Sequence, residues 1–120
     1  MHSFSRTHTN RLLSGLMDEN VVWVNQMVAT RAGLKSGDWV RLRNQDGALS
    51  NRIAVKATER IRPDCVYLVH GFGHKARGLR HAFGKGASDA GLITRYRTDP
   101  LMGGTAMNVN FVTLEPAEAV

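Results

Sequence analysis

The apolar residues of this chain come in short runs, each about as long as one strand and each bounded by turn-forming residues. Residues 21–24 (VVWV) are one such run. In residues 39–43 (WVRLR), apolar and basic side chains alternate with the period of a half-buried strand. The Asp46-Gly47 pair that follows is typical of a tight hairpin, so we expect residues 48–57 to pair antiparallel with this strand. Short runs and closely spaced turns favour a mainly β fold.

Three further segments complete the expected elements. Residues 26–32 predict a short helix that Asn25 caps at its start and Gly33 closes at its end. Residues 65–70 form the most continuous apolar run and are expected to be a central strand. Residues 107–115 alternate into a closing strand.

The single cysteine, Cys65, excludes an intramolecular disulfide, and it excludes an iron–sulfur cluster or Cys-based zinc site held within this chain. Its place in an apolar run predicts a small core side chain. A length of 120 residues is typical of one domain, and we assign residues 1–120 to a single domain. No apolar run approaches the roughly 20 residues that a membrane-spanning helix needs, so membrane insertion is not supported.

The formal net charge of +6 favours anionic partners, which include nucleic acid, an acidic membrane surface and phosphate-bearing small molecules. Glycines crowd residues 71–91 and periodicity is lost there, which indicates a long irregular loop of the kind usually kept for function. A short strand is expected at residues 92–94. Between residues 71 and 97 only Asp89 opposes the basic side chains, which are Lys75, Arg77, Arg80, Lys85, Arg95 and Arg97.

Four stretches resemble the C-terminal molybdopterin dinucleotide-binding domain of the dimethyl sulfoxide reductase family of molybdenum oxidoreductases. They are residues 2–13, 22–40 and 60–74, and residues 86–89 followed by 99–104. They are most similar to the thiosulfate and polysulfide reductase branch. The chain departs from the family pattern at His8, where the family often has Gln or another polar residue, and at Arg11, where it often has Pro. The resemblance implies a mainly β fold, a six-stranded double-psi β-barrel with short helices, as in aspartate decarboxylase.

The resemblance also implies a function. The domain is expected to bind one dinucleotide arm of a bis-molybdopterin guanine dinucleotide cofactor, as the C-terminal part of a larger enzyme. The molybdenum ligand belongs to other domains, so we expect no catalytic and no metal-binding residue in this chain and no activity in isolation. Expected partners are the remaining domains of the parent enzyme and an iron–sulfur electron-transfer subunit. The parent is expected to be a bacterial periplasmic or membrane-associated enzyme, exported by the twin-arginine route.

Such a cofactor carries a pyrophosphate, a guanine and a pterin, so its site needs backbone N–H groups, further donors and an acceptor for the guanine edge. The opening segment supplies donors and acceptors. Its candidate cofactor-binding residues are Ser5, Arg6, Thr7, His8, Thr9 and Asn10. Arg6 and His8 are expected to face the anion or the dithiolene end. The alternative interpretation of this segment is a solvated loop.

A second group of candidates follows the apolar run. Gly71 and Gly73 let the backbone approach a ligand closely, Phe72 can pack on a pterin or guanine ring, and His74 can donate to phosphate. On its own, Gly-x-Gly more often marks an ordinary turn, and a single His after a strand is more often a surface residue. This is not a dinucleotide-binding fingerprint, because no third glycine opens a helix after it.

Ser88 and Asp89 form the third group. A carboxylate can accept two hydrogen bonds from the N1 and N2 groups of guanine, which makes Asp89 the candidate that selects this base. The alternative for Asp89 is a salt bridge to Arg80 or Lys85 within the loop.

Other functions are weighed against this one. A free-standing, small basic barrel that binds nucleic acid, or a separate subunit of a molybdenum enzyme, is the alternative. We expect no nucleic-acid partner, because Trp23, Trp39, Tyr67 and Phe111 all fall in patterns typical of core strands, which leaves few aromatics for base stacking. A self-processing decarboxylase is disfavoured because the chain contains no Gly-Ser dipeptide at which to cleave.

Overall fold

Alternating burial along the strands builds the core of the protein. β1 (Val21–Asn25) and β2 (Trp39–Asn44) each alternate buried with more exposed side chains, as the sequence predicts. Val22, Val24, Val40 and Leu42 turn inward from these two strands, and β3 (Ile53–Thr58) adds Ile53 and Val55. All six side chains are at most 2% exposed, so one apolar cluster covers a single face of the sheet.

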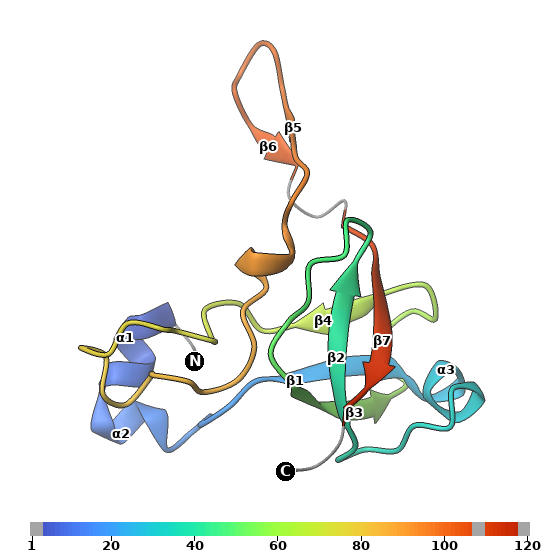
Figure 1. The fold of residues 1–120 in the computed structure, drawn as a ribbon, viewed down its shortest axis with the longest axis horizontal. Coiled ribbons are helices and arrows are strands. Elements are labelled where there is room, and N and C mark those ends of the chain that lie inside the picture. The colour runs from blue at the N-terminus through green and yellow to red at the C-terminus, as the bar shows by residue number, and fades with distance from the viewer. Residues whose placement is uncertain (1–3, 107–109, 118–120) are drawn as a thin grey trace.

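The computed structural model describes residues 4–106 and 110–117. β4 (Val66–Leu68) and β7 (Val112–Pro116) complete a five-stranded sheet in the order β4-β1-β3-β2-β7 (Figure 1). β1 pairs in parallel with β3, and the other neighbours are antiparallel. The predicted hairpin between β2 and β3 is confirmed, since Trp39 pairs with Ala54 and Val40 with Ile53.

The six-stranded double-psi β-barrel is not confirmed, whereas a mainly β fold with a few short helices is. Within the described residues the sheet stays open, because β4 pairs only with β1 and β7 pairs only with β2. The remaining two strands, β5 (Arg97–Thr98) and β6 (Thr105–Ala106), pair with each other as a separate hairpin. The two edges of the sheet therefore do not meet.

Two predictions about residues 65–70 are wrong. The strand they form is the three-residue edge strand β4 and not a central strand. Cys65 lies before this strand and is exposed, so it is not a core side chain. A run of apolar residues predicts a strand, but it does not determine whether that strand lies at the centre or at the edge of its sheet.

Local signals for the helix and the turns hold. Asn25 caps α3 (Gln26–Arg31) by accepting a hydrogen bond from the Met27 amide at 3.0 Å. Gly33 follows with φ +69, the left-handed conformation that closes a helix. The predicted closing strand begins at Val112, and residues 107–109 lie outside the described part of the chain.

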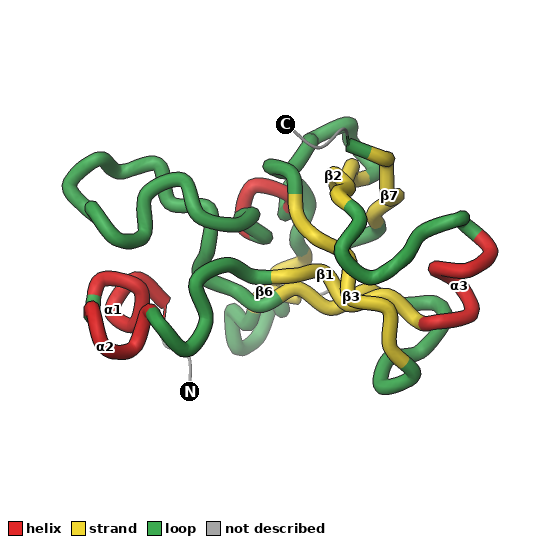
Figure 2. Tube along the Cα trace, turned by 90° about the horizontal axis from the view of Figure 1, so that it is seen from below, coloured by secondary structure: helices red, strands yellow, loops and turns green. Residues whose placement is uncertain are grey.

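The opposite end of the molecule consists of short helices and loop (Figure 2). α1 (Phe4–Thr9) and α2 (Arg11–Ser14) lie at the same end as the glycine-rich loop in both views. We call this part the polar lobe, and it comprises α1, α2, Asn20 and residues 70–89. A 3-10 helix, η1 (Ala90–Leu92), follows the loop, and residues 93–94 belong to no strand, so the short strand expected at residues 92–94 is wrong. Among the described residues, no helix has the length and apolar character to cross a bilayer.

Candidate functional site

The opening segment and the glycine-rich loop pack against each other. The His8 ring lies edge-on to Phe72, with ring centroids 3.9 Å apart and an interplanar angle of 67°. Both side chains are 2% exposed, and the neighbouring Thr7 is also buried. The His74 ring centroid lies 6.2 Å from that of His8. Residues separated by more than 60 positions in the sequence therefore form one buried cluster.

The other candidates of the opening segment take different places. Ser5 and Arg6 lie on α1. Thr9 and Asn10 are exposed at the junction of the two helices. The Asn10 side chain accepts hydrogen bonds from the amides of Leu12 and Leu13 at 3.0 and 3.2 Å, so its oxygen caps α2. Thr7 and His8 are buried and Thr9 and Asn10 exposed in this segment, which is helical from residue 4 to residue 9.

Gly73 brings two parts of the loop into direct contact. Its φ is +74, and a Cβ at this position would lie 2.4 Å from the backbone nitrogen of Ser88. Its own amide donates to the Lys85 carbonyl at 2.8 Å. Gly71 also has a positive φ, of +89. No side chain fits at Gly73, so the Gly-aromatic-Gly turn lies directly on Ser88.

Asn20 is a structural residue of the site that sequence reasoning missed. Its buried side-chain amide donates to the carbonyls of Val69 and Ala87, both at 2.9 Å, and its Oδ1 accepts from the Ala87 amide at 2.9 Å. A Cβ on Gly86, whose φ is +65, would lie 2.3 Å from that oxygen. Asn20 thus joins the end of β4 to the loop before Ser88. An asparagine just before a strand looks like a turn residue, so the sequence carried no signal for this role.

Asp89 has a partner that was not predicted. Its Oδ2 lies 2.6 Å from Nδ1 of His70, so the proposed salt bridge to Arg80 or Lys85 is wrong. Lys85 pairs with Asp18 instead. Asp89 and Ser88 are both half-buried at the start of η1. The structure therefore adds His70 to the group of predicted site residues.

His74 has one nitrogen that the described residues leave unsatisfied. Its Nε2 is buried, and no hydrogen-bond partner for it lies within residues 4–106 and 110–117. A buried polar atom without a partner costs about 1–3 kcal/mol. Such an atom fits a site where a polar group from outside this chain completes the hydrogen bonding.

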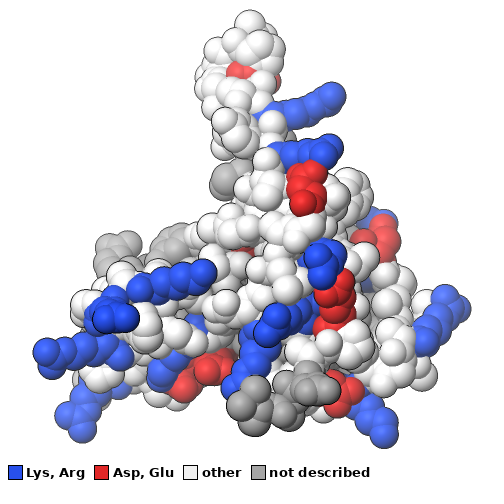
Figure 3. Space-filling model, viewed as in Figure 1, with Lys and Arg blue, Asp and Glu red and all other residues white. Residues whose placement is uncertain are grey.

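Positive charge gathers around the polar lobe. Figure 3 shows Lys and Arg side chains over the part that carries α1, α2 and the loop. Lys75, Arg77 and Arg80 of the loop are exposed, and so is Arg11 of α2. Lys85 pairs with Asp18 and Arg95 with Asp46, whereas the exposed basic side chains of the loop and of α2 provide a positive field that attracts anionic ligands.

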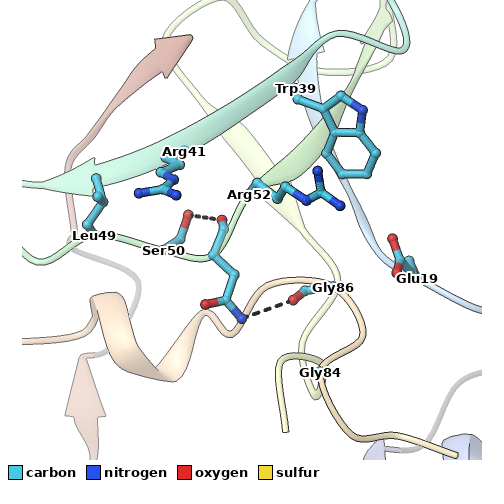
Figure 4. A pocket seen from close by; sticks show the side chains of 9 residues that line it. Glu19, Trp39, Arg41, Leu49, Ser50, Arg52, Gly84 and Gly86 are labelled. Carbon is cyan, nitrogen blue, oxygen red and sulfur yellow. Dashed lines mark hydrogen bonds between the residues drawn. The ribbon is translucent and has the colours of Figure 1, made fainter. Parts of the chain in front are cut away.

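A cavity of about 450 Å³ lies beside the polar lobe, and sequence reasoning missed it (Figure 4). It is lined by Glu19, Trp39, Arg41, Leu49, Ser50, Asn51, Arg52, Gly84 and Gly86. The Arg52 guanidinium lies 4.8 Å from the centre of the Trp39 ring. None of the predicted site residues lines this cavity. It could not be found in the sequence because its walls come from four separate segments.

The aromatic side chains correct another prediction. Tyr67 and Phe111 are exposed and not in the core. Trp23 is half-buried on the outer face of the sheet, where Tyr67 lies edge-on to it at 5.4 Å and Lys56 covers its ring. Trp39 is also half-buried. A scarcity of exposed aromatics is therefore no argument against nucleic-acid binding.

The fold and the polar lobe define a small, mainly β domain with a basic, glycine-lined surface. The family model described as "Molydopterin dinucleotide binding domain" matches residues 1–111, and the chain belongs to this family. Membership of the family supports a molybdopterin guanine dinucleotide cofactor.

Curated relatives agree with this family. The chain is 35% identical over 117 residues to the thiosulfate reductase molybdopterin-containing subunit PhsA of Salmonella typhimurium. The matched region covers 98% of this chain and 15% of that protein. It is 31% identical to the putative dimethyl sulfoxide reductase chain YnfE and 30% identical to the probable dimethyl sulfoxide reductase chain YnfF, both of Escherichia coli. Each of these matches covers 95% of this chain and 14% of the relative. The chain thus spans only a small part of each relative's length.

Proposed function

We propose that this domain holds one arm of a bis-molybdopterin guanine dinucleotide cofactor as the C-terminal domain of a larger molybdenum oxidoreductase. The proposal includes a thiosulfate or polysulfide reductase activity for the parent enzyme. Family membership and the similarity to the thiosulfate reductase subunit support it. The residues of this chain bind and orient, and none of them is assigned a catalytic role.

The packing of α1 on the glycine-rich loop is the observation that carries the proposal. The His8–Phe72 contact and the close approach of Gly73 to Ser88 bring all three groups of candidate residues into one lobe. Backbone amides beside glycines can approach a phosphate, because no side chain shields them. The exposed basic side chains of the loop add a field that favours an anion there.

Roles within the site follow from the chemistry of each group. Gly71 and Arg6 are assigned to the pyrophosphate. Gly73, whose amide already donates to the Lys85 carbonyl, is assigned to keeping the turn in contact with Ser88, and the buried Phe72 ring supports the turn. The unsatisfied Nε2 of His74 is assigned to an oxygen of the cofactor. Asp89 is assigned to the guanine edge, with His70 holding its carboxylate. When bound, the cofactor supplies the redox chemistry.

The remaining assignments of the parent enzyme belong to this proposal. Other domains provide the molybdenum ligand, an iron–sulfur subunit exchanges electrons with the enzyme, and the assembly works in the bacterial periplasm. Closure of the sheet into the double-psi β-barrel is also part of it. The edge strands β4 and β7 each use one side for pairing within the described residues, and this leaves their outer backbone groups open to a further strand.

Calorimetric titration of the 120-residue chain tests the binding function. We expect GDP to bind more tightly than ADP or UDP, because only guanine offers the N1 and N2 donors that Asp89 accepts. The Asp89→Asn variant keeps the size of the side chain and is expected to lose most of this preference. Equal affinity for the three nucleotides would contradict the proposal. Tighter, salt-sensitive binding of a single-stranded oligonucleotide would favour the nucleic-acid alternative instead.

A further inference from the structure

The β5–β6 hairpin stands apart from the rest of the molecule (Figure 1). Within residues 4–106 and 110–117 its strands pair only with each other, through Arg97 with Ala106 and Thr98 with Thr105. Neither strand packs on any other helix or strand of the described chain. A two-stranded hairpin without a covering layer is marginally stable in water. Contacts beyond the sheet are therefore needed to keep this arm in one shape.

The tip of the hairpin is nevertheless well organised. Oδ1 of Asp99 accepts hydrogen bonds from the amides of Leu101 and Met102 at 2.8 and 2.7 Å. The Asp99 amide donates to the Gly104 carbonyl at 2.8 Å, and Gly103, with φ +69, donates back to Asp99 at 3.0 Å. These bonds fix the backbone of the turn, so its side chains leave the molecule in defined directions.

This organised tip presents two large apolar side chains to solvent. Leu101 is 90% exposed and Met102 is 89% exposed, more than any other large apolar side chain described. Figure 3 shows the tip as mainly uncharged, with basic side chains lower on the arm. An apolar pair on a preorganised turn loses little conformational freedom when it binds, and this is typical of a side-chain anchor.

The base of the arm is tied to the sheet. Arg95 forms an ion pair with Asp46, in the turn between β2 and β3, and Nε of Arg95 lies 2.9 Å from Oδ2 of that carboxylate. Thr94 also donates to Asp46, at 2.6 Å. These bonds hold the start of the arm against the sheet, so its direction is set by the domain that carries it.

We infer that residues 97–106 form a docking arm whose Leu101 and Met102 insert into an apolar groove on another domain of the same polypeptide. The inference rests on the proposed function, in which this chain is one domain of a larger molybdoenzyme. The relatives support another domain of the same polypeptide as the binding partner. The matched region is only 15% and 14% of their length, so most of each polypeptide lies outside it.

Hydrogen exchange in the full-length molybdoenzyme that carries this domain tests the inference. The amides of Leu101 and Met102 are expected to exchange at least about tenfold more slowly there than in the 120-residue chain, because docking excludes water from the tip. The Leu101→Ser/Met102→Ser variant should return to the fast rate. Leu101→Met/Met102→Leu should keep the slow rate, because it conserves apolar volume. Met27→Ser, at an exposed methionine on α3, is the matched control and should leave the arm protected.

Three results would overturn the inference. One is an equal exchange rate of the arm in the full-length enzyme and in the short chain, and another is slow exchange that survives the double serine variant. Slowing in the short chain that grows with protein concentration would assign the tip to a second copy of this chain. Cofactor content is measured in the same full-length samples. A cofactor-free enzyme with a protected arm would contradict the proposed function and leave the docking arm standing.

Discussion

The sheet and the parts outside it are built from different kinds of contact. Valine, leucine and isoleucine side chains cover one face of the sheet and form a single apolar cluster. The polar lobe holds the buried polar residues Thr7, His8 and Asn20. Its buried Phe72 and Ala82 lie outside the apolar cluster, and only its Ala87 joins the cluster. A core of the first kind tolerates many apolar residues of similar size. The lobe depends on particular atoms, which is typical of a functional region.

The largest effect on stability is expected from a cavity in the apolar cluster of the sheet. Leu42→Ala removes a fully buried side chain from β2, and we expect unfolding free energy to fall by about 2–5 kcal/mol. Leu12→Ala, at an 86% exposed leucine on α2, should change it by less than about 0.5 kcal/mol. Urea unfolding measures both. Equal effects of the two variants would show that the sheet is not the stabilising unit.

A smaller effect is expected from the joint between sheet and lobe. Asn20→Ala leaves the Ala87 amide and two carbonyls without their partner, and we expect a loss of about 1–3 kcal/mol in unfolding free energy. The matched variant is Asn51→Ala, whose exposed side chain makes a single bond of 3.4 Å to Gly86. Faster hydrogen exchange at Ala87 in Asn20→Ala but not in Asn51→Ala would show that Asn20 holds the loop against the sheet. Unchanged exchange there would mean that Asn20 does not hold the loop.

The smallest effect is expected when acid protonates Asp99 at the tip of the β5–β6 hairpin. The amides of Met102 and Leu101 hold the pKa of Asp99 below its ordinary value of 3.8. A lowered pKa means that these bonds stabilise the turn fully above about pH 3.8 and lose that contribution as pH falls through the folded-state pKa. Amide chemical shifts of Leu101 and Met102 should therefore titrate below pH 3.8, and Asp99→Ala should abolish the step. A midpoint above 3.8 would contradict the turn geometry.

Elements with a local signal were predictable from the sequence. The alternation in β2, the cap at Asn25 and the left-handed Gly33 each depend on residues next to one another in the chain. The edge position of β4 and the open sheet were not predictable, because both depend on which distant strand pairs with which. The same limit applies to the helical state of residues 4–9, which pack on a loop more than 60 residues away.

The candidate site was predictable in part and for a different reason. The family resemblance assigned His8 and Phe72 to the same cofactor, and the structure adds that the two rings are in contact. The alternative interpretation of Asp89, a salt bridge to Arg80 or Lys85, is wrong, because the fold places His70 beside its carboxylate. The pair of Arg41 and Arg52 beside Trp39 carried no signal, since the cavity exists only after four segments have come together.

Cofactor occupancy of two glycine variants in the full-length enzyme tests the central claim, that the loop packed on α1 binds the cofactor. Gly73 and Gly84 have nearly the same φ, +74 and +73, but a Cβ meets Ser88 at 2.4 Å only at Gly73 and nothing within 4 Å at Gly84. Backbone strain is therefore matched, and only the contact between the two loop segments differs. We predict that Gly73→Ala loses most of its cofactor while Gly84→Ala retains it. Equal cofactor content in the two purified variants would contradict the account.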